Sequence, residues 1–205
     1  MIKNLITQSY RNIRNRILAK RYPWLVPFSG WENNKETYKY SKSLYTEPDY
    51  GGWNKAFFYL LMEDIRKAAK KAGIINQLHT EDYKSKYGGL RFYLDGCNDE
   101  ISNIVHTYEM LSEHICEICG EPDVGYIGGW ITPICEHCYN KQRYNKPYYA
   151  AISKNRKMPD EYRYLKFLPD DDKGKEIHID IRDTANRIRK RWNRKHPFRK
   201  RKPYA

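Results

Sequence analysis

The sequence predicts an α+β fold: a helix–hairpin–helix core with an inserted zinc ribbon, followed by a C-terminal hairpin and a basic helical tail. Three observations lead to this architecture. Segments 53–73 and 98–114 repeat apolar residues at steps of three and four, as amphipathic helices do. Between them, residues 78–94 hold two short β-type runs about a Gly-Gly pair, which is typical of a hairpin. Directly after the second helix, paired cysteines begin with the spacing of a zinc site.

Four of the five cysteines form two Cys-x2-Cys pairs separated by fifteen residues: Cys116, Cys119, Cys135 and Cys138. Two thiolates on a tight turn can face one ion, and two such turns complete a tetrahedron with Zn–S distances of ~2.3 Å. Four thiolates leave no open position for a catalytic water. We therefore expect one structural Zn²⁺ per chain.

Other uses of these cysteines fit the sequence less well. Two disulfides would need an oxidising compartment, and the opening MIKNLITQSYRN has no apolar signal core. A redox Cys-x2-Cys would need a thioredoxin-like βαβ context, which the pattern lacks. His114 and His137 flank the pairs and could replace a thiolate, although a bystander role is favoured. Cys97 stands alone after Gly96 and is expected to be a buried or idle thiol.

The chain divides by composition into four parts. Residues 1–52 form a basic N-terminal helix and an extended wrap, 53–140 the α+β core with the zinc ribbon at 116–138, 141–181 a connector and hairpin, and 182–205 the basic tail. The first helix should end before Tyr22-Pro23, because a residue preceding proline is pushed out of helical geometry, and 23–28 should then be extended. The second hairpin is expected from strands 161–168 and 176–181.

Capping residues place the ends of the expected helices. Gly73 suits the end of the 53–73 helix, and Asn98 or Asp99 suits the start of the next. Asp183 is expected to cap a last helix that runs to about Trp192. The apolar stripes and the first hairpin should pack as one core: Phe57, Leu61, Ile65, Leu90, Phe92, Ile104, Tyr108 and Leu111.

Charge is concentrated in the basic tail. The chain carries +13, and the tail holds eleven Lys and Arg residues against one acid, or +10, which leaves +3 for residues 1–181. Such a segment is typical of a nucleic-acid-binding arm, although membrane phosphates or an acidic protein could also attract it. Few apolar residues of the tail are expected to join the core, so its removal should leave folding intact. No apolar run approaches the ~18–20 residues that span a bilayer.

The residues expected to contact nucleic acid come from the tail and from one strand. Arg91 alternates with the apolar Leu90 and Phe92, which places it on the opposite face of its strand. The first helix carries further basic residues. The candidate nucleic-acid-binding residues are Arg91, Arg187, Arg189, Lys190, Arg191, Arg194, Lys195, Arg199, Lys200, Arg201 and Lys202.

An ordered set of motifs supports a family resemblance. The motifs are Arg21-Tyr22-Pro23-Trp24-Leu25-x-Pro27, Gly52-Trp53-x-Lys55-Ala56-Phe57, Lys84-x-Lys86-Tyr87-Gly88-Gly89-Leu90-Arg91-Phe92-Tyr93, Leu111-Ser112-Glu113, Cys116-x2-Cys119-Gly120 and Gly129-Trp130-Ile131-x-Pro133-x-Cys135-x2-Cys138. Over roughly residues 20–140 the chain resembles a family of small zinc-ribbon proteins of bacteriophages and prophages. The resemblance implies a phage-borne accessory protein acting in the bacterial cytoplasm. It implies no reaction, and it does not cover the tail.

The sequence argues against an enzyme. An HNH-type nuclease needs a His base and His or Asn ligands between its cysteine pairs, and residues 121–134 contain neither. A zinc deaminase needs His-x-Glu, which neither His106 nor His178 begins. The run Asp170–Asp172 could bind a divalent ion, although solvated carboxylates in a turn are the favoured interpretation.

Two binding roles therefore stay open. In one, a non-enzymatic zinc protein binds DNA or RNA through its basic tail. In the other, a phage anti-defence or host-takeover effector, for example an inhibitor of the anti-CRISPR type, docks on a host complex that handles nucleic acid. There the tail would occupy a groove built for nucleic acid. The two roles differ in salt response and in whether a protein partner is required.

Overall fold

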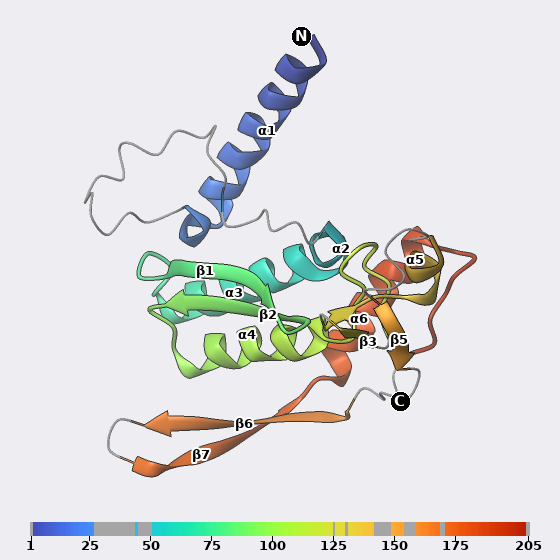
Figure 1. Ribbon diagram of the computed structural model, residues 1–205. Helices are drawn as coiled ribbons and strands as arrows, with labels where there is room; N and C mark the ends of the chain where they lie inside the picture. The colour runs from blue at the N-terminus through green and yellow to red at the C-terminus, as the bar shows by residue number, and fades with distance from the viewer. Residues whose placement is uncertain are drawn as a thin grey trace. The chain divides into compact units, whose positions relative to one another are not determined.

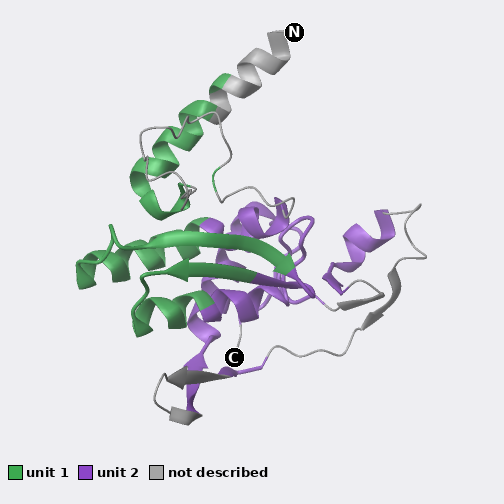
Figure 2. Cartoon of the chain, turned by 60° about the vertical axis from the view of Figure 1, so that its left-hand side comes forward, with its two compact units in different colours: residues 1–50, 59–85, 91–105 green, residues 51–58, 86–90, 106–205 purple. Residues whose placement is uncertain are grey.

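Helices and small antiparallel sheets alternate along the chain, so the fold is α+β (Figure 1). The computed structural model describes residues 2–26, 44, 51–124, 126–129, 131–141, 149–153, 159–168 and 171–203. These residues divide into unit 1 (1–50, 59–85 and 91–105) and unit 2 (51–58, 86–90 and 106–205), coloured in Figure 2. Among the described residues, no helix is both long enough and apolar enough to cross a membrane.

In unit 1, helix α1 (Ile2–Arg21) ends where the sequence predicts, directly before Tyr22-Pro23. The expectation of an extended segment after it is wrong at its start, because residues Pro23–Leu25 form a short 3-10 helix, η1. Proline fits the first position of such a turn, since its missing N–H would have no partner there. The N–H of Val26 closes the turn on the carbonyl of Pro23 at 3.3 Å, and Leu25 is buried. Residues 27–28 lie outside the described residues.

The carboxylate of Glu63, on helix α3 (Tyr59–Ala72), binds residues at the end of α1. Glu63 accepts hydrogen bonds from Arg21 Nε at 2.6 Å, from the Tyr22 hydroxyl at 2.6 Å and from Arg66 Nη2 at 2.7 Å. Partial burial opposes ionisation of Glu63, but the bonds from Arg21, Arg66 and Tyr22 outweigh it and lower the pKa of Glu63 to about 2. Tyr22 is itself buried. This network attaches the end of α1 to α3.

The expected helix 53–73 is longer at its start and is not uniform. It begins as α2 (Gly51–Trp53), passes through one π-helical segment, η3 (Asn54–Phe58), and continues as α3. Strands β1 (His79–Lys86) and β2 (Gly89–Asp95) follow and pair about a turn at Tyr87-Gly88. Tyr83 and Phe92 meet edge to face, with ring centroids 5.2 Å apart.

Helix α4 (Asp99–Ser112) starts at the predicted cap, since the side-chain oxygen of Asn98 accepts the N–H of Ile101 at 3.0 Å. The expected core residues are buried, except that Ile104 is half-buried. On α4, Ile101 and Val105 fill the buried positions on either side of it.

Unit 2 contains the remaining strands and two further helices. They are β3 (Tyr126–Gly129), β4 (Thr132–Pro133), α5 (Glu136–Lys141), β5 (Tyr149–Ser153), β6 (Glu161–Leu168), β7 (Asp171–Asp180) and α6 (Arg182–Lys195). Strands β4, β3 and β5 form one sheet in that order, and β6 pairs with β7. Strand β5, which pairs with β3, was not predicted, and it lies in the part of 141–181 that was expected to be a connector.

Two boundaries in the last part of the chain also differ from prediction. Strand β7 begins at Asp171, so part of the expected turn 169–174 is strand, while Asp170 lies outside the described residues. The N-cap of α6 is Ile181, with no side-chain cap, and Asp183 lies in the first turn. The prediction that Asp183 caps this helix is therefore wrong. An acid in the first turn still stabilises the helix dipole.

Candidate metal centre and basic face

Two backbone turns present the paired cysteines in unit 2. In the first, the N–H of Gly120 donates to the carbonyl of Cys116, and the N–H of Cys116 donates to the carbonyl of Glu121, both at 2.9 Å. In the second, Cys135 directly precedes α5, and the N–H of Cys138 points at the Cys135 sulfur at 3.4 Å. Hydrogen bonds from backbone N–H groups fix both turns. The sulfurs of one pair are therefore held facing the sulfurs of the other pair.

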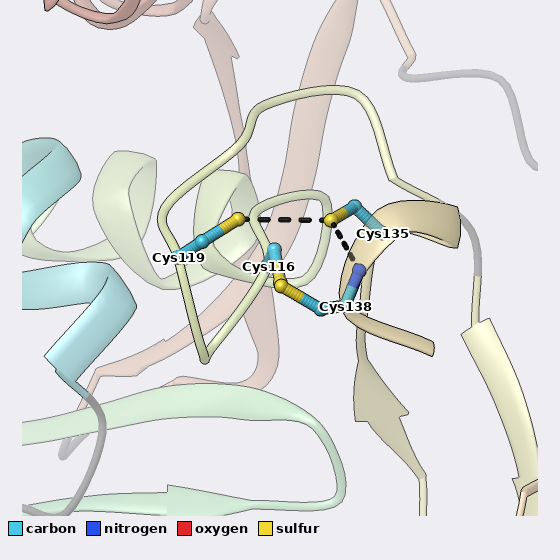
Figure 3. Close-up of side chains that lie close together, drawn as sticks. All are labelled: Cys116, Cys119, Cys135 and Cys138. Atoms are coloured by element: carbon cyan, nitrogen blue, oxygen red, sulfur yellow. Dashed lines mark hydrogen bonds between the residues drawn. The ribbon is translucent and has the colours of Figure 1, made fainter. Parts of the chain in front are cut away.

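The side chains of the four cysteines lie close together (Figure 3). The four-cysteine cluster consists of Cys116, Cys119, Cys135 and Cys138, whose Sγ atoms all lie within 4.8 Å of one another. The Cys119 and Cys135 sulfurs are 3.6 Å apart, and a tetrahedron of thiolates at ~2.3 Å from an ion has sulfurs ~3.8 Å apart. The cluster therefore fits a tetrahedrally coordinated metal ion.

The chemistry of the donors agrees with this geometry. No cysteine is in a disulfide, since all five are free thiols. Burial raises the pKa of Cys138, and so does the proximity of Cys116 and Cys135. Four thiolates cannot share this volume without a compensating cation, which a divalent metal supplies. Among the described residues the metal-binding group contains neither His114, which is buried, nor His137, which is exposed.

The first cysteine turn rests directly on the backbone of α2. The N–H of Gly52 donates to the carbonyl of Glu117 at 2.7 Å, and a Cβ on Gly52 would lie 2.2 Å from the carbonyl oxygen of Cys116. Gly120 has φ +85°, and a Cβ there would lie 2.6 Å from the carbonyl oxygen of Gly52. Only glycine permits both approaches. Trp53, fully buried, donates from Nε1 to the carbonyl of Ile115 at 3.0 Å.

Two acids that follow the first cysteine pair bind arginines of the basic tail. The Glu121 carboxylate is only 6% exposed, and each of its oxygens accepts one arginine, Arg199 or Arg201. Asp123 accepts two bonds from Arg189, whose Nε lies 2.9 Å away. Arg199 Nη2 also lies 3.8 Å from the Cys135 sulfur. Three of the arginines expected to contact nucleic acid, Arg189, Arg199 and Arg201, therefore form ion pairs inside unit 2.

Helix α6 packs through one face, so the expectation that few tail residues join the core is wrong. Ala185, Ile188 and Trp192 are buried and recur at steps of three and four. Trp192 Nε1 donates to the carbonyl of Arg199 at 2.8 Å. Asn193 exchanges two hydrogen bonds with the backbone of Arg201, at 2.7 and 2.6 Å. The segment after α6 is thereby folded back along the helix.

The opposite side of α6 forms what we term the basic face. Its members are Arg187, Lys190, Arg191, Arg194 and Lys195, which are neighbours at steps of three and four. Three of them (Lys190, Arg194 and Lys195) are exposed, and the other two are half-buried. No Asp or Glu occurs between Thr184 and Pro203. Lys200 and Lys202, beyond the helix, are also exposed.

The remaining candidates lie in unit 1. Arg91 is half-buried between the buried Leu90 and Phe92, as strand alternation predicts. Cys97 is half-buried, its sulfur lies 3.1 Å from the carbonyl oxygen of Leu94, and burial together with Asp95 raises its pKa to about 11. This thiol therefore stays protonated near neutral pH.

Sequence reasoning placed the cluster but missed its surroundings. Sequence reasoning did not single out Glu121 or Asp123, because no local pattern signals which arginines they bind. The double glycine before Trp53 was a usable signal of close backbone approach. Comparison of the chain with protein-family models, with curated proteins and with solved structures gives no match.

Proposed function

We propose that this protein is a non-enzymatic, zinc-stabilised nucleic-acid-binding protein in which the basic face of α6 contacts phosphates. The basic face is the observation that carries the proposal. It presents five cations without an intervening acid, on a helix whose other side is buried. A regular array of cations on a fixed helix suits a polyanion with regularly spaced charges, and nucleic acid is such a partner.

Zinc is the metal that the donor set favours. Tetrahedral sites of four sulfurs select zinc or iron–sulfur clusters over harder ions. A single ion matches the 3.6 Å separation of the Cys119 and Cys135 sulfurs. The antiparallel β3–β4 pair lies between the two cysteine turns, as in a zinc ribbon. In this proposal the metal has a folding role, because four thiolates leave no site for a reacting group.

The cations of the tail have two different roles. Arg189, Arg199 and Arg201 hold the tail to Asp123 and Glu121, and Arg182 pairs with Asp180. The candidates for phosphate contact are the residues of the basic face together with the exposed Lys200 and Lys202. Substitution of Arg189, Arg199 or Arg201 should impair folding, whereas substitution in the basic face should impair binding.

The test is a titration of the full-length protein with a DNA duplex of about 20 base pairs, and with a matched RNA, at several salt concentrations. Five phosphate contacts predict a slope of log affinity against log salt of about −4.5 on the duplex, since each contact contributes about −0.9. K190Q/R194Q should reduce the magnitude of this slope by about 1.8. K67Q/K70Q, which removes two exposed lysines of α3, is the matched control and should leave the slope unchanged.

Two outcomes would count against nucleic-acid binding through α6. One is an equal slope for the wild type and K190Q/R194Q. The other is weak salt dependence together with tight binding to a single protein of an infected host, which would favour the docking role.

A further inference from the structure

A cavity of about 280 Å³ lies within unit 2, beside the four-cysteine cluster. Its wall is made by η3, by the first cysteine turn and by the end of α6. The lining residues are Lys55, Ala56, Cys119, Gly120, Arg191, Trp192, Lys195 and His196. None of them is an acid, so the cavity is cationic.

Three cations converge on this cavity from two elements. Arg191 Nε donates to the carbonyl of Lys55 at 3.1 Å, which fixes the guanidinium at the wall. Lys55 and Lys195 have no acidic partner among the residues that the structure describes. Partial burial lowers the pKa of Lys195, as does repulsion from Arg191, Arg194 and Lys55. An anion in the cavity would relieve this repulsion.

The local charge balance indicates how much negative charge is missing. A zinc ion with four thiolates carries a net charge of about −2. Glu121 adds one negative charge, and its partners Arg199 and Arg201 add two positive charges. Lys55, Arg191 and Lys195 then leave a surplus of about two positive charges next to the cavity. A phosphate monoester carries about −1.5 to −2 near pH 7, which matches the surplus better than the single charge of a diester.

We propose that this cavity binds a phosphate monoester, supplied by the terminal phosphate of a nucleic-acid strand or by a free nucleotide. The strand-end form rests on the proposed function. Arg191 and Lys195 belong to both the basic face and the cavity, so a strand lying along α6 would end there. Ala56 and Trp192 give the wall an apolar part, and His196 stacks on Trp192 with ring centroids 3.7 Å apart. An apolar part of the wall suits the sugar that follows the phosphate.

The experiment compares the affinities of three versions of one single strand, which carry a 5′-phosphate, a 3′-phosphate or only hydroxyl ends. The strand has about 12 nucleotides, a length within the site sizes of proteins that bind single strands. We expect about tenfold tighter binding of one phosphorylated strand, the effect of one charge-assisted hydrogen bond. K55Q should abolish this preference and leave the salt slope of the strand with hydroxyl ends unchanged, because Lys55 lies on η3 and not on α6. K190Q/R194Q should reduce the slope and keep the preference. K195Q provides a second cavity variant.

The arms separate the possible results. Equal affinity for phosphate and hydroxyl ends, together with no binding of a mononucleotide, overturns the cavity assignment, even if the salt slope still supports nucleic-acid binding. Lys55 could instead only balance the charge of the cluster. In that case K55Q will weaken metal retention against a chelator, and the wild type will not prefer a phosphorylated strand end. The cavity assignment then fails. A mononucleotide whose binding is lost in K55Q identifies a nucleotide as the source. Binding of inorganic phosphate or mononucleotide that is indifferent to K55Q overturns the assignment.

Discussion

At the scale of single residues, Glu121 links the metal centre to the basic tail. Its carboxylate is nearly inaccessible to solvent, and two arginines that are about one-third exposed neutralise it. A buried charge is tolerated only when it is paired, because desolvation alone would cost several kcal/mol. Glu121 is therefore a structural requirement of unit 2.

Glu121→Gln should lower the free energy of unfolding by about 1.5–3 kcal/mol, the usual range for hydrogen bonds to charged groups. Urea unfolding of the metal-loaded protein measures this change. Glu81→Gln, an exposed acid on β1, is the matched control and should change stability by no more than about 0.5 kcal/mol. Equal stability of the two variants would show that Arg199 and Arg201 do not depend on Glu121.

Glu63 gives a pH dependence whose sign follows from its lowered pKa. Its pKa is about 2 in the folded protein and 4.5 as the reference value. The stabilisation from ionised Glu63 is therefore complete above about pH 4.5 and is lost as the pH falls toward 2. Other carboxylates titrate in the same window, so the informative quantity is the difference between wild type and Glu63→Gln. That difference in unfolding free energy should shrink on acidification, and a difference that stays constant from pH 7 to pH 3 would refute the role of the network.

At the scale of elements, α6 is both an interior and a surface helix. Trp192 is 5% exposed, donates to the Arg199 carbonyl and has the Arg199 guanidinium 5.5 Å from its ring centre. Trp192→Ala should cost about 3–5 kcal/mol, as for other buried aromatic residues. Phe198→Ala is the control on the same segment, because Phe198 is 99% exposed and should cost almost nothing. A thermal melt of both variants decides whether the tail is part of the folded unit.

The same helix shows where prediction from sequence succeeds and where it fails. The helical pattern and the cluster of cations are local properties, so both could be read directly from the residues. The burial of Ala185, Ile188 and Trp192 depends on a surface made by residues far away in the chain. Hairpin β6–β7 was predicted for the same local reason, whereas strand β5 depends on its partner β3 and was missed.

At the scale of the whole molecule, metal binding and folding of unit 2 should be a single equilibrium. The cluster joins the turn at Cys116–Gly120 to the start of α5. The same turn also contacts the backbone of α2. The spacing of the cysteines predicted the candidate ligands, because two Cys-x2-Cys turns at this separation are typical of a zinc site. It could not predict the contact with α2, since Gly52 and Gly120 meet only in the folded chain.

Elemental analysis should find one zinc per chain, and a strong chelator should unfold unit 2, because structural zinc contributes about 10–16 kcal/mol in small metal-dependent domains. Cys116→Ser should have the same effect as the chelator. Cys97→Ser is the matched control, since this thiol lies outside the four-cysteine cluster and its sulfur lies beside the backbone carbonyl of Leu94. Well-folded protein without metal, shown by circular dichroism and melting, would contradict a structural zinc.

The contacts of the metal centre also set an order of events during folding. The cysteines lie within one short stretch of chain, whereas Arg199 is 78 residues from Glu121 and Arg191 is 136 residues from Lys55. Closing the longer loops costs more entropy, and contacts between distant residues form slowly. A metal ion present at the start of refolding would therefore be captured before α6 arrives. The arginines would then reach a centre that already carries its negative charge, and attraction to that charge would guide the last helix into place.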